Sequence, residues 1–175
     1  MEIFLKTFGV IWLPKAATTL TRFWRKVSGH RCAEVLGSSA RALARKVIGW
    51  ENITEDTLCL DSTVLTRYGN QQGAKRGYNP KKKGRPSHHP IVAFLGSKYI
   101  VNLWNRSGDV FSGASAKDFF RQTIASLGAE FRILRLICDC GFYLIEFIEY
   151  LESRGYSYII AVRLGRSGPN FWNRR

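Results

Sequence analysis

The chain has 175 residues, enough for one domain with its own apolar core. Hydrophobic residues make up 45% of it, which excludes a wholly disordered chain. Lysine and arginine number 27 against 13 aspartate and glutamate residues, a formal net charge of +14. A folded protein with this excess of positive charge typically binds a polyanion, and nucleic acid is the first candidate. The alternative is a merely basic protein, such as one associated with the ribosome.

Residues 1–56 predict an N-terminal helical segment. Ile3–Leu13 is apolar, but it is short, Lys6 interrupts it and Glu2 precedes it, so it fits neither a membrane span nor a signal peptide. Leu20–Val27 has helical spacing, with its basic side chains on the face opposite the apolar one; that face either lies on DNA phosphates or is simply solvated. A second helix is expected over Ala33–Ile48. Its core candidates are Val35, Leu36, Leu43 and Val47.

Two apolar runs each carry an aspartate. Thr57–Val64 is rich in β-branched and apolar residues and predicts a buried strand, with Asp61 inside it. Phe131–Cys138 predicts a second strand, and Asp139 follows it directly. A carboxylate in such a strand is costly unless something pairs with it. We therefore expect Asp61 and Asp139 to lie on neighbouring strands and to share a divalent metal ion.

The cysteines are expected to be reduced thiols of a cytoplasmic protein, because two of them fall in predicted core strands and nothing else indicates export. They are Cys32, Cys59, Cys138 and Cys140. Cys138 and Cys140 flank Asp139 and are expected on the opposite face from it. A zinc site on Cys-x-Cys would need two more soft ligands at suitable spacing, and the sequence offers none.

A basic stretch follows the first aspartate. No Asp or Glu occurs from Ser62 to Gly108, and Lys75–Pro86 has the glycine and proline content of a mobile loop. Its cations cannot be neutralised locally, so we expect them to contact duplex DNA, with a solvated basic excursion as the alternative. These candidate DNA-binding residues are Lys75, Arg76, Lys81, Lys82, Lys83 and Arg85.

Three residues near this stretch have simpler interpretations. Tyr78 is expected to be an ordinary packed tyrosine, with base stacking or a sugar contact as the alternative. His88 and His89 are expected to be polar loop residues, because neighbours on an extended chain point apart and rarely bind one metal together.

The remaining pattern predicts a mixed α/β architecture. Two strand-like runs, 90–95 and 99–104, form a hairpin. A capping box at Ser115–Asp118 opens a helix, which gives Asp118 a structural role. A helix over Phe142–Ser153 keeps its glutamates on a solvent face, and a strand over Tyr156–Arg163 precedes a basic tail, 165–175. Three strands followed by alternation with helices indicate a mixed sheet covered by helices, an arrangement similar to a ribonuclease-H-like core.

Three motifs resemble the insertion-sequence transposases of the DDE class. They are Leu60–Val64, Gln72–Pro90 with its Gly-Tyr-Asn-Pro and Arg-Pro-Ser-His-His-Pro pieces, and Cys138–Phe142. The resemblance runs from about Thr18 to Leu164. It implies a ribonuclease-H-like core over residues 57–164, in which the first and fourth strands lie side by side and each carries an acid.

The resemblance also implies the chemistry. Asp61 matches the first catalytic acid of the family and Asp139 the second, and together they would hold Mg²⁺ or Mn²⁺ for displacement at phosphorus. The partner would be double-stranded DNA with terminal inverted repeats, in the cytoplasm at the nucleoid, and a homodimer is compatible with this. Cys140 stands where the family usually has serine. The third acid of the family is a glutamate on a helix after the last strand, and this chain stops before such a helix.

Three functions follow from this resemblance. The chain is a transposase that cuts and joins DNA, a non-catalytic DNA-binding remnant, or a structure-selective nuclease of the same fold. The missing third acid predicts DNA binding with little or no strand cleavage. Glu146 or Glu149 could replace that acid only by turning inward, against the apolar face of their helix.

Overall fold

The computed structural model describes residues 30–162. The chain divides after Leu36 into two units, and the sheets described below belong to the second. The predicted helix over residues 20–27 and the basic tail, 165–175, lie outside the described residues. None of the helices in the described part of the chain is long and apolar enough to cross a membrane.

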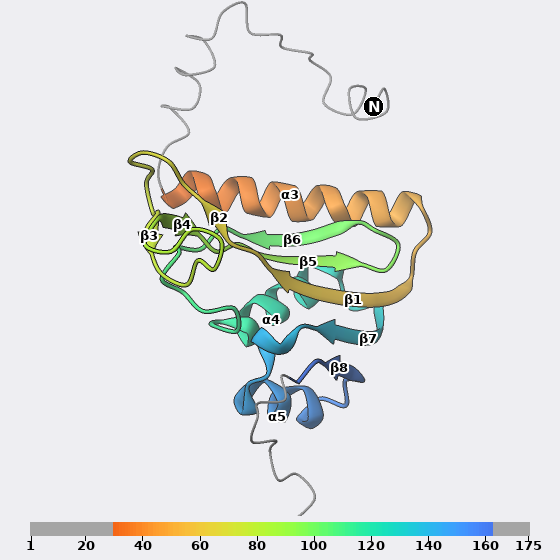
Figure 1. The fold of residues 1–175 in the computed structure, drawn as a ribbon. Coiled ribbons are helices and arrows are strands. Elements are labelled where there is room, and N and C mark those ends of the chain that lie inside the picture. The colour runs from red at the N-terminus through yellow and green to blue at the C-terminus, as the bar shows by residue number, and fades with distance from the viewer. Residues whose placement is uncertain (1–29, 163–175) are drawn as a thin grey trace, which may run out of the picture. The chain divides into compact units, whose positions relative to one another are not determined.

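The main sheet has five strands in the order β6-β5-β1-β7-β8 (Figure 1). They are β1 (Glu55–Ser62), β5 (Ile91–Leu95), β6 (Ile100–Trp104), β7 (Arg132–Cys138) and β8 (Tyr158–Ile160). β1 pairs antiparallel with β5 and parallel with β7, and β7 pairs parallel with β8. The first and fourth strands of this sheet are therefore neighbours, and the predicted mixed ribonuclease-H-like core is confirmed.

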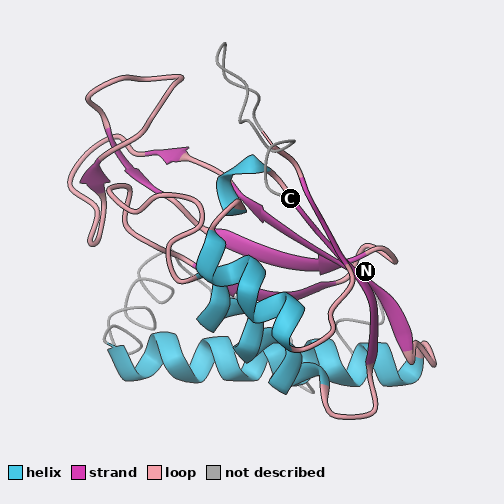
Figure 2. Cartoon of the chain, turned by 90° about the horizontal axis from the view of Figure 1, so that it is seen from below, coloured by secondary structure: helices cyan, strands magenta, loops and turns pink. Residues whose placement is uncertain are grey.

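The described α-helices are α3 (His30–Trp50), α4 (Ala116–Leu127) and α5 (Ile145–Ser153). Within the second unit, α4, α5 and the part of α3 from Gly37 onward lie on one side of this sheet (Figure 2). Apolar residues at helical spacing on α4 and α5 face the sheet, and the largest, Phe119, Phe120 and Phe147, are almost completely buried. The strand residues that meet them, such as Leu58 and Leu136, are fully buried as well.

The other face of the sheet is exposed. Because side chains alternate along a strand, Cys59 and Asp61 lie on the face opposite buried Leu58 and Leu60. Ile100, Leu103 and Ile159 are 60%, 50% and 52% exposed, and no helix within residues 37–162 covers the sheet on this side (Figure 2). The first aspartate is therefore on the open face.

Three predicted details of the helices are wrong. Val35 and Leu36, which were expected in the core, are exposed, whereas Ile48 near the C-terminal end of α3 is buried in it. Ser115 has a left-handed backbone (φ 58°) and makes no side-chain cap, so there is no capping box. The helix predicted over 142–153 is split into a 3₁₀ turn, η1 (Cys140–Phe142), and α5.

A second, small sheet forms where a structureless loop was predicted. Its strands are β2 (Leu65–Thr66), β3 (Lys75–Arg76) and β4 (Pro86–His88), in the order β2-β4-β3. We call residues 65–88 the basic lobe. Arg67 donates a backbone hydrogen bond to Pro86 within the lobe, and just before the lobe Thr63 donates one to Pro90, which directly precedes β5.

Candidate active site

The two predicted acids lie at the same end of adjacent strands. Leu60 of β1 is in register with Cys138 of β7, and Asp61 and Asp139 are the next residues on each strand. Neighbouring strands are ~4.8 Å apart, and the carboxyl ends of parallel strands meet at one edge. Asp139 keeps an extended backbone (ψ 177°), so alternation directs it, like Asp61, to the open face. Both side chains are exposed.

Each carboxylate is oriented by a backbone N–H. The Ser62 amide donates to Asp61 Oδ1 at 2.8 Å, and the Gly141 amide donates to Asp139 Oδ1 at 3.0 Å. The second bond makes Asp139 the N-terminal cap of η1. Within residues 30–162 neither Oδ2 atom has a hydrogen bond, so each acid presents one oxygen to the solvent side.

A pocket of about 500 Å³ connects this end of the sheet to the basic lobe. Asp139, Cys140 and Gly141 line it from the sheet, whereas Tyr78 and Lys81 line it from the lobe. Its remaining lining residues are Ser62, Thr63, Val64, Pro80, His89 and Ser112. Tyr78 is 67% exposed, so the expectation that it is a packed core tyrosine is wrong.

The predicted DNA-binding cations all lie on the surface of the basic lobe. Five of the six have no acidic partner within residues 30–162. Lys75 is the exception: it pairs with Asp109 at 3.1 Å, which corrects the prediction that none of the cations is neutralised locally. Hydrogen bonds from Ser107 and Lys75 lower the pKa of Asp109, so this partner stays ionised at neutral pH. Arg85 lies over the ring of Tyr68, 5.6 Å from its centroid.

Buried polar side chains hold the basic lobe together. Asn79 accepts a hydrogen bond from the Lys82 amide and donates one to Thr66 Oγ1, both at 3.0 Å, and so ties the lysine turn to β2. His88 is buried; it accepts from Arg67 Nε at 2.8 Å and donates to the Gln72 carbonyl at 3.0 Å. The prediction that His88 is a polar loop residue is wrong, because the ring is packed inside the lobe.

His89 lies in the short connection between β4 and β5, as a loop residue would, but it is buried. It stands two residues before the start of β5 and lines the pocket beside Asp139, a position that the sequence pattern did not indicate. One sequence feature could have indicated this position: His89 belongs to the motif His-His-Pro, which stands immediately before an apolar strand.

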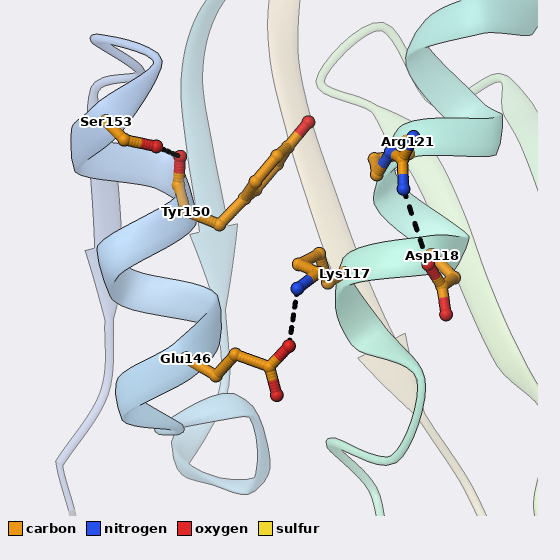
Figure 3. A network of polar contacts seen from close by, with 6 residues as sticks. All are labelled: Lys117, Asp118, Arg121, Glu146, Tyr150 and Ser153. Atoms are coloured by element: carbon orange, nitrogen blue, oxygen red, sulfur yellow. Dashed lines mark hydrogen bonds and ion pairs between the residues drawn. The ribbon is translucent and has the colours of Figure 1, made fainter.

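The glutamates of α5 are exposed, as predicted. Glu146 forms an ion pair with Lys117 of α4, and this contact lowers the pKa of Glu146 (Figure 3). Asp118 lies near Arg121 on the same α4 surface, at 3.8 Å (Figure 3). These acids belong to a surface network between two helices.

The two cysteines beside Asp139 have different surroundings. Cys138 is buried on the helix side of the sheet, and burial together with the Asp139 charge raises the pKa of its thiol. Cys140 lines the pocket with Asp139. Its expected place on the opposite face is therefore wrong, because the chain turns into η1 immediately after Asp139.

The donor set suits a hard divalent cation only in part. Asp61 and Asp139 offer carboxylate oxygens, which Mg²⁺ and Mn²⁺ prefer, and Mg²⁺ is commonly held by one or two carboxylates plus substrate phosphates. Residues 30–162 contain no group of three or more His, Cys, Asp or Glu side chains that could hold a metal ion. The two exposed carboxylates would thus supply only part of the oxygen ligands that such an ion takes.

One family model covers both the main sheet and the basic lobe. The chain matches the family model "Transposase DDE domain group 1" over residues 15–167. It therefore belongs to the DDE transposases. No curated protein sequence matches it.

Solved transposase structures are similar at low identity. A piggyBac transposase synaptic complex with hairpin DNA is 17% identical with a TM-score of 0.44, covering 70% of this chain and 26% of that one. The Mos1 transposase paired-end complex with the left transposon end is 10% identical with a TM-score of 0.44, covering 88% and 47%. The Mos1 mariner paired-end complex with Mn is 11% identical with a TM-score of 0.41, covering 88% and 48%. The chain thus spans between a quarter and a half of their lengths.

Proposed function

We propose that this chain cuts and joins DNA strands by metal-dependent phosphoryl transfer, as the transposase of an insertion sequence. The observation that carries the proposal is the position of Asp61 and Asp139. They end two adjacent parallel strands, and Asp139 lines a pocket whose other wall is the basic lobe. Asp139, a proposed ligand of the cation, and Lys81, a proposed phosphate contact, thus border the same space, and Asp61 lies on the neighbouring strand.

In this proposal Asp61 and Asp139 hold Mg²⁺ or Mn²⁺ through their free carboxylate oxygens. When bound, such an ion lowers the pKa of a water or hydroxyl nucleophile and stabilises charge on the leaving oxygen. The Gly141 amide keeps Asp139 oriented before DNA arrives. This fixed geometry is what a displacement at phosphorus requires from the protein.

The basic lobe supplies the affinity for DNA. Lys81 reaches the pocket, and Lys82, Lys83 and Arg85 continue the positive surface away from it. Contacts of this kind follow the phosphate backbone and position the duplex without reading its sequence. The substrate we propose is double-stranded DNA with terminal inverted repeats, brought together by a homodimer at the nucleoid.

The test compares the wild-type chain with the double variant Asp61→Ala/Asp139→Ala on terminal-repeat DNA in Mg²⁺ and in Mn²⁺. We expect strand cleavage to fall by at least about 100-fold, because both proposed ligands of the ion are removed, while DNA binding in a gel-shift assay is retained. Asp118→Ala is the matched control, because Asp118 is an exposed acid on α4 that faces Arg121. Equal cleavage by the double variant and the wild type would overturn the assignment.

DNA binding without cleavage is a second candidate. It is favoured by the lack of a third ligand near the two aspartates among the described residues. In this case the chain would bind terminal-repeat DNA, compete with a complete transposase, and have no activity for the double variant to lose. Robust Mg²⁺-dependent nicking by the purified wild-type chain would rule it out.

A further inference from the structure

His89 occupies an unusual place in the pocket. It is only 2% exposed, yet it lines the same space as Asp139. Its Nδ1 lies 2.6 Å from the Val110 carbonyl oxygen, so Nδ1 carries the proton in this contact, because a carbonyl can only accept. In the neutral ring Nε2 is then an acceptor, and it faces the Ser112 hydroxyl at 3.5 Å. The imidazole thus contacts both ends of a short segment, 110–112.

Arg106 fastens the same segment from the other side. Its guanidinium donates to the carbonyl oxygens of His89, Ser112 and Ala114, at 3.0, 3.1 and 2.6 Å. Burial lowers the pKa of Arg106, but a guanidinium remains charged at neutral pH. Because these bonds are charge-assisted, they hold the segment firmly against the backbone of His89.

The fastened segment packs against the turn that carries Asp139. A Cβ added to Gly113 would lie 2.7 Å from the Gly141 carbonyl oxygen. A Cβ added to Gly141 would lie 2.6 Å from Ser112 Cβ and 3.1 Å from Asp139 Oδ1. Ser112 and the Asp139 carboxylate therefore flank the same glycine, and a small shift of one changes the space available to the other.

We propose that His89 is a positioning residue for Asp139. Its imidazole fixes the Ser112 hydroxyl against Gly141, and this contact keeps the Gly141 amide bonded to Asp139 Oδ1. The functional meaning of this role rests on the proposed metal site, but the hydrogen-bond geometry can be measured without it. A histidine that only filled the core would have no influence on the Gly141 amide.

The test measures the solvent-exchange rate of the Gly141 amide by NMR in the full chain. Asp139→Ala removes the acceptor and defines the fully released rate. We expect Ser112→Ala and His89→Asn to raise the rate toward that value, by about five- to tenfold, as expected when one hydrogen bond is removed. Asparagine can still donate to Val110 but has no equivalent of Nε2. His88→Asn is the matched control and should leave Gly141 unchanged, because His88 contacts the basic lobe.

An internal reference separates local from global effects. The Leu136 amide donates to the Ser157 carbonyl in the core, at 2.8 Å, and exchanges only when the sheet opens. Faster exchange at Gly141 with Leu136 unchanged supports the proposal. An unchanged Gly141 rate in Ser112→Ala overturns it, even if His89→Asn fails to fold.

A second measurement on the same proteins distinguishes this inference from the proposed function. Titration with Mn²⁺ should give weaker binding for Ser112→Ala than for the wild type. If the wild type binds Mn²⁺ no better than Asp139→Ala, the metal role of Asp139 fails, whereas the exchange rates still decide the positioning role of His89.

Discussion

The main sheet and the basic lobe are filled by different kinds of side chain. Behind the main sheet, most of the fully buried residues are apolar, such as Leu58 and Phe120, and Thr123 is a hydrogen-bonded exception. In the lobe, His88 and Asn79 are buried instead, and each is held by two hydrogen bonds. Apolar packing is non-directional and spread over many contacts, whereas hydrogen bonds depend on a few defined partners. We therefore expect the stability of the main sheet to fall when a buried side chain is made smaller. The stability of the lobe should instead fall when one hydrogen-bonding group is moved or removed.

This difference also separates the two parts of the proposed activity. The acids stand at the ends of strands that the apolar core holds in register, and the cations proposed to bind DNA stand on a lobe that polar contacts hold in shape. A change in the lobe can thus weaken DNA binding while the aspartates stay in place. Substitutions in each region can test this separation, and the largest effect is expected in the core.

A cavity in the core should affect the whole domain. Phe120 is fully buried, and its ring packs edge-to-face on Phe147, Tyr150 and Tyr156. Phe120→Ala should lower the free energy of unfolding by about 3–5 kcal/mol, as other buried phenylalanines do. Urea denaturation measures this, with Phe111→Ala, at a 58% exposed position, as the control. A decrease below about 1 kcal/mol would contradict the assigned core.

One added methyl group should disturb the lobe alone. A Cβ at Gly77 would lie 1.9 Å from the Gly108 carbonyl oxygen, so the lobe must move away from that backbone. Gly77→Ala should cost the lobe about 1–3 kcal/mol of local stability and leave the main sheet intact. Hydrogen exchange can measure both regions in one experiment.

The matched control is Gly49→Ala in α3, where a Cβ meets no atom within 4 Å. Alanine is the better helix former, so this change should be neutral or stabilise the chain. If Gly77→Ala raised the amide exchange rates of the lobe and of the main sheet to the same extent, the two regions would form one cooperative unit.

Removing two lysines should change how DNA binding depends on salt. Lys82→Ala/Lys83→Ala should reduce the slope of log K against log salt by about 1.8, because each phosphate neutralised by a lysine contributes about 0.9 to that slope. Fluorescence anisotropy over a range of salt concentrations measures the slope. Arg121→Ala/Arg154→Ala removes the same charge from α4 and the end of α5 and should leave the slope nearly unchanged. Equal slopes for both double variants would show that the lobe has no special role in DNA binding.

The main sheet could be predicted from the sequence because its signal is local. Apolar runs identified the strands, and the aspartates at their ends indicated which strands were neighbours. The observed register, with Leu60 beside Cys138, places Asp61 and Asp139 as that reasoning expected. Only element ends and caps were misplaced, as at Ser115, where the backbone is left-handed and the side chain cannot cap.

The lobe could not be predicted in the same way. Its contacts join residues that are far apart in the sequence and follow neither the helical nor the strand repeat. Gly77 matters through its approach to Gly108, and Lys75 finds Asp109 only after the chain has folded. Buried histidines look like loop residues when they stand in a Gly- and Pro-rich stretch. The position of His89 beside Asp139 follows from the pairing of β5 with β1, which no local pattern reveals.

Thiol labelling should distinguish the two sides of the Asp139 strand without changing its stability. Burial and the Asp139 charge raise the pKa of Cys138, so almost none of it is thiolate at pH 8, whereas Cys140 is partly exposed in the pocket. In a Cys32→Ser background, iodoacetamide should modify Cys140 in the folded chain and Cys138 only after unfolding, because the thiolate is the reactive form. Peptide mass spectrometry reads out each site, and Cys59 should also react slowly, since burial raises its pKa. If Cys138 and Cys140 were modified at the same rate, the strand end would not separate a packed side from a pocket side, and the orientation inferred for Asp139 would be wrong.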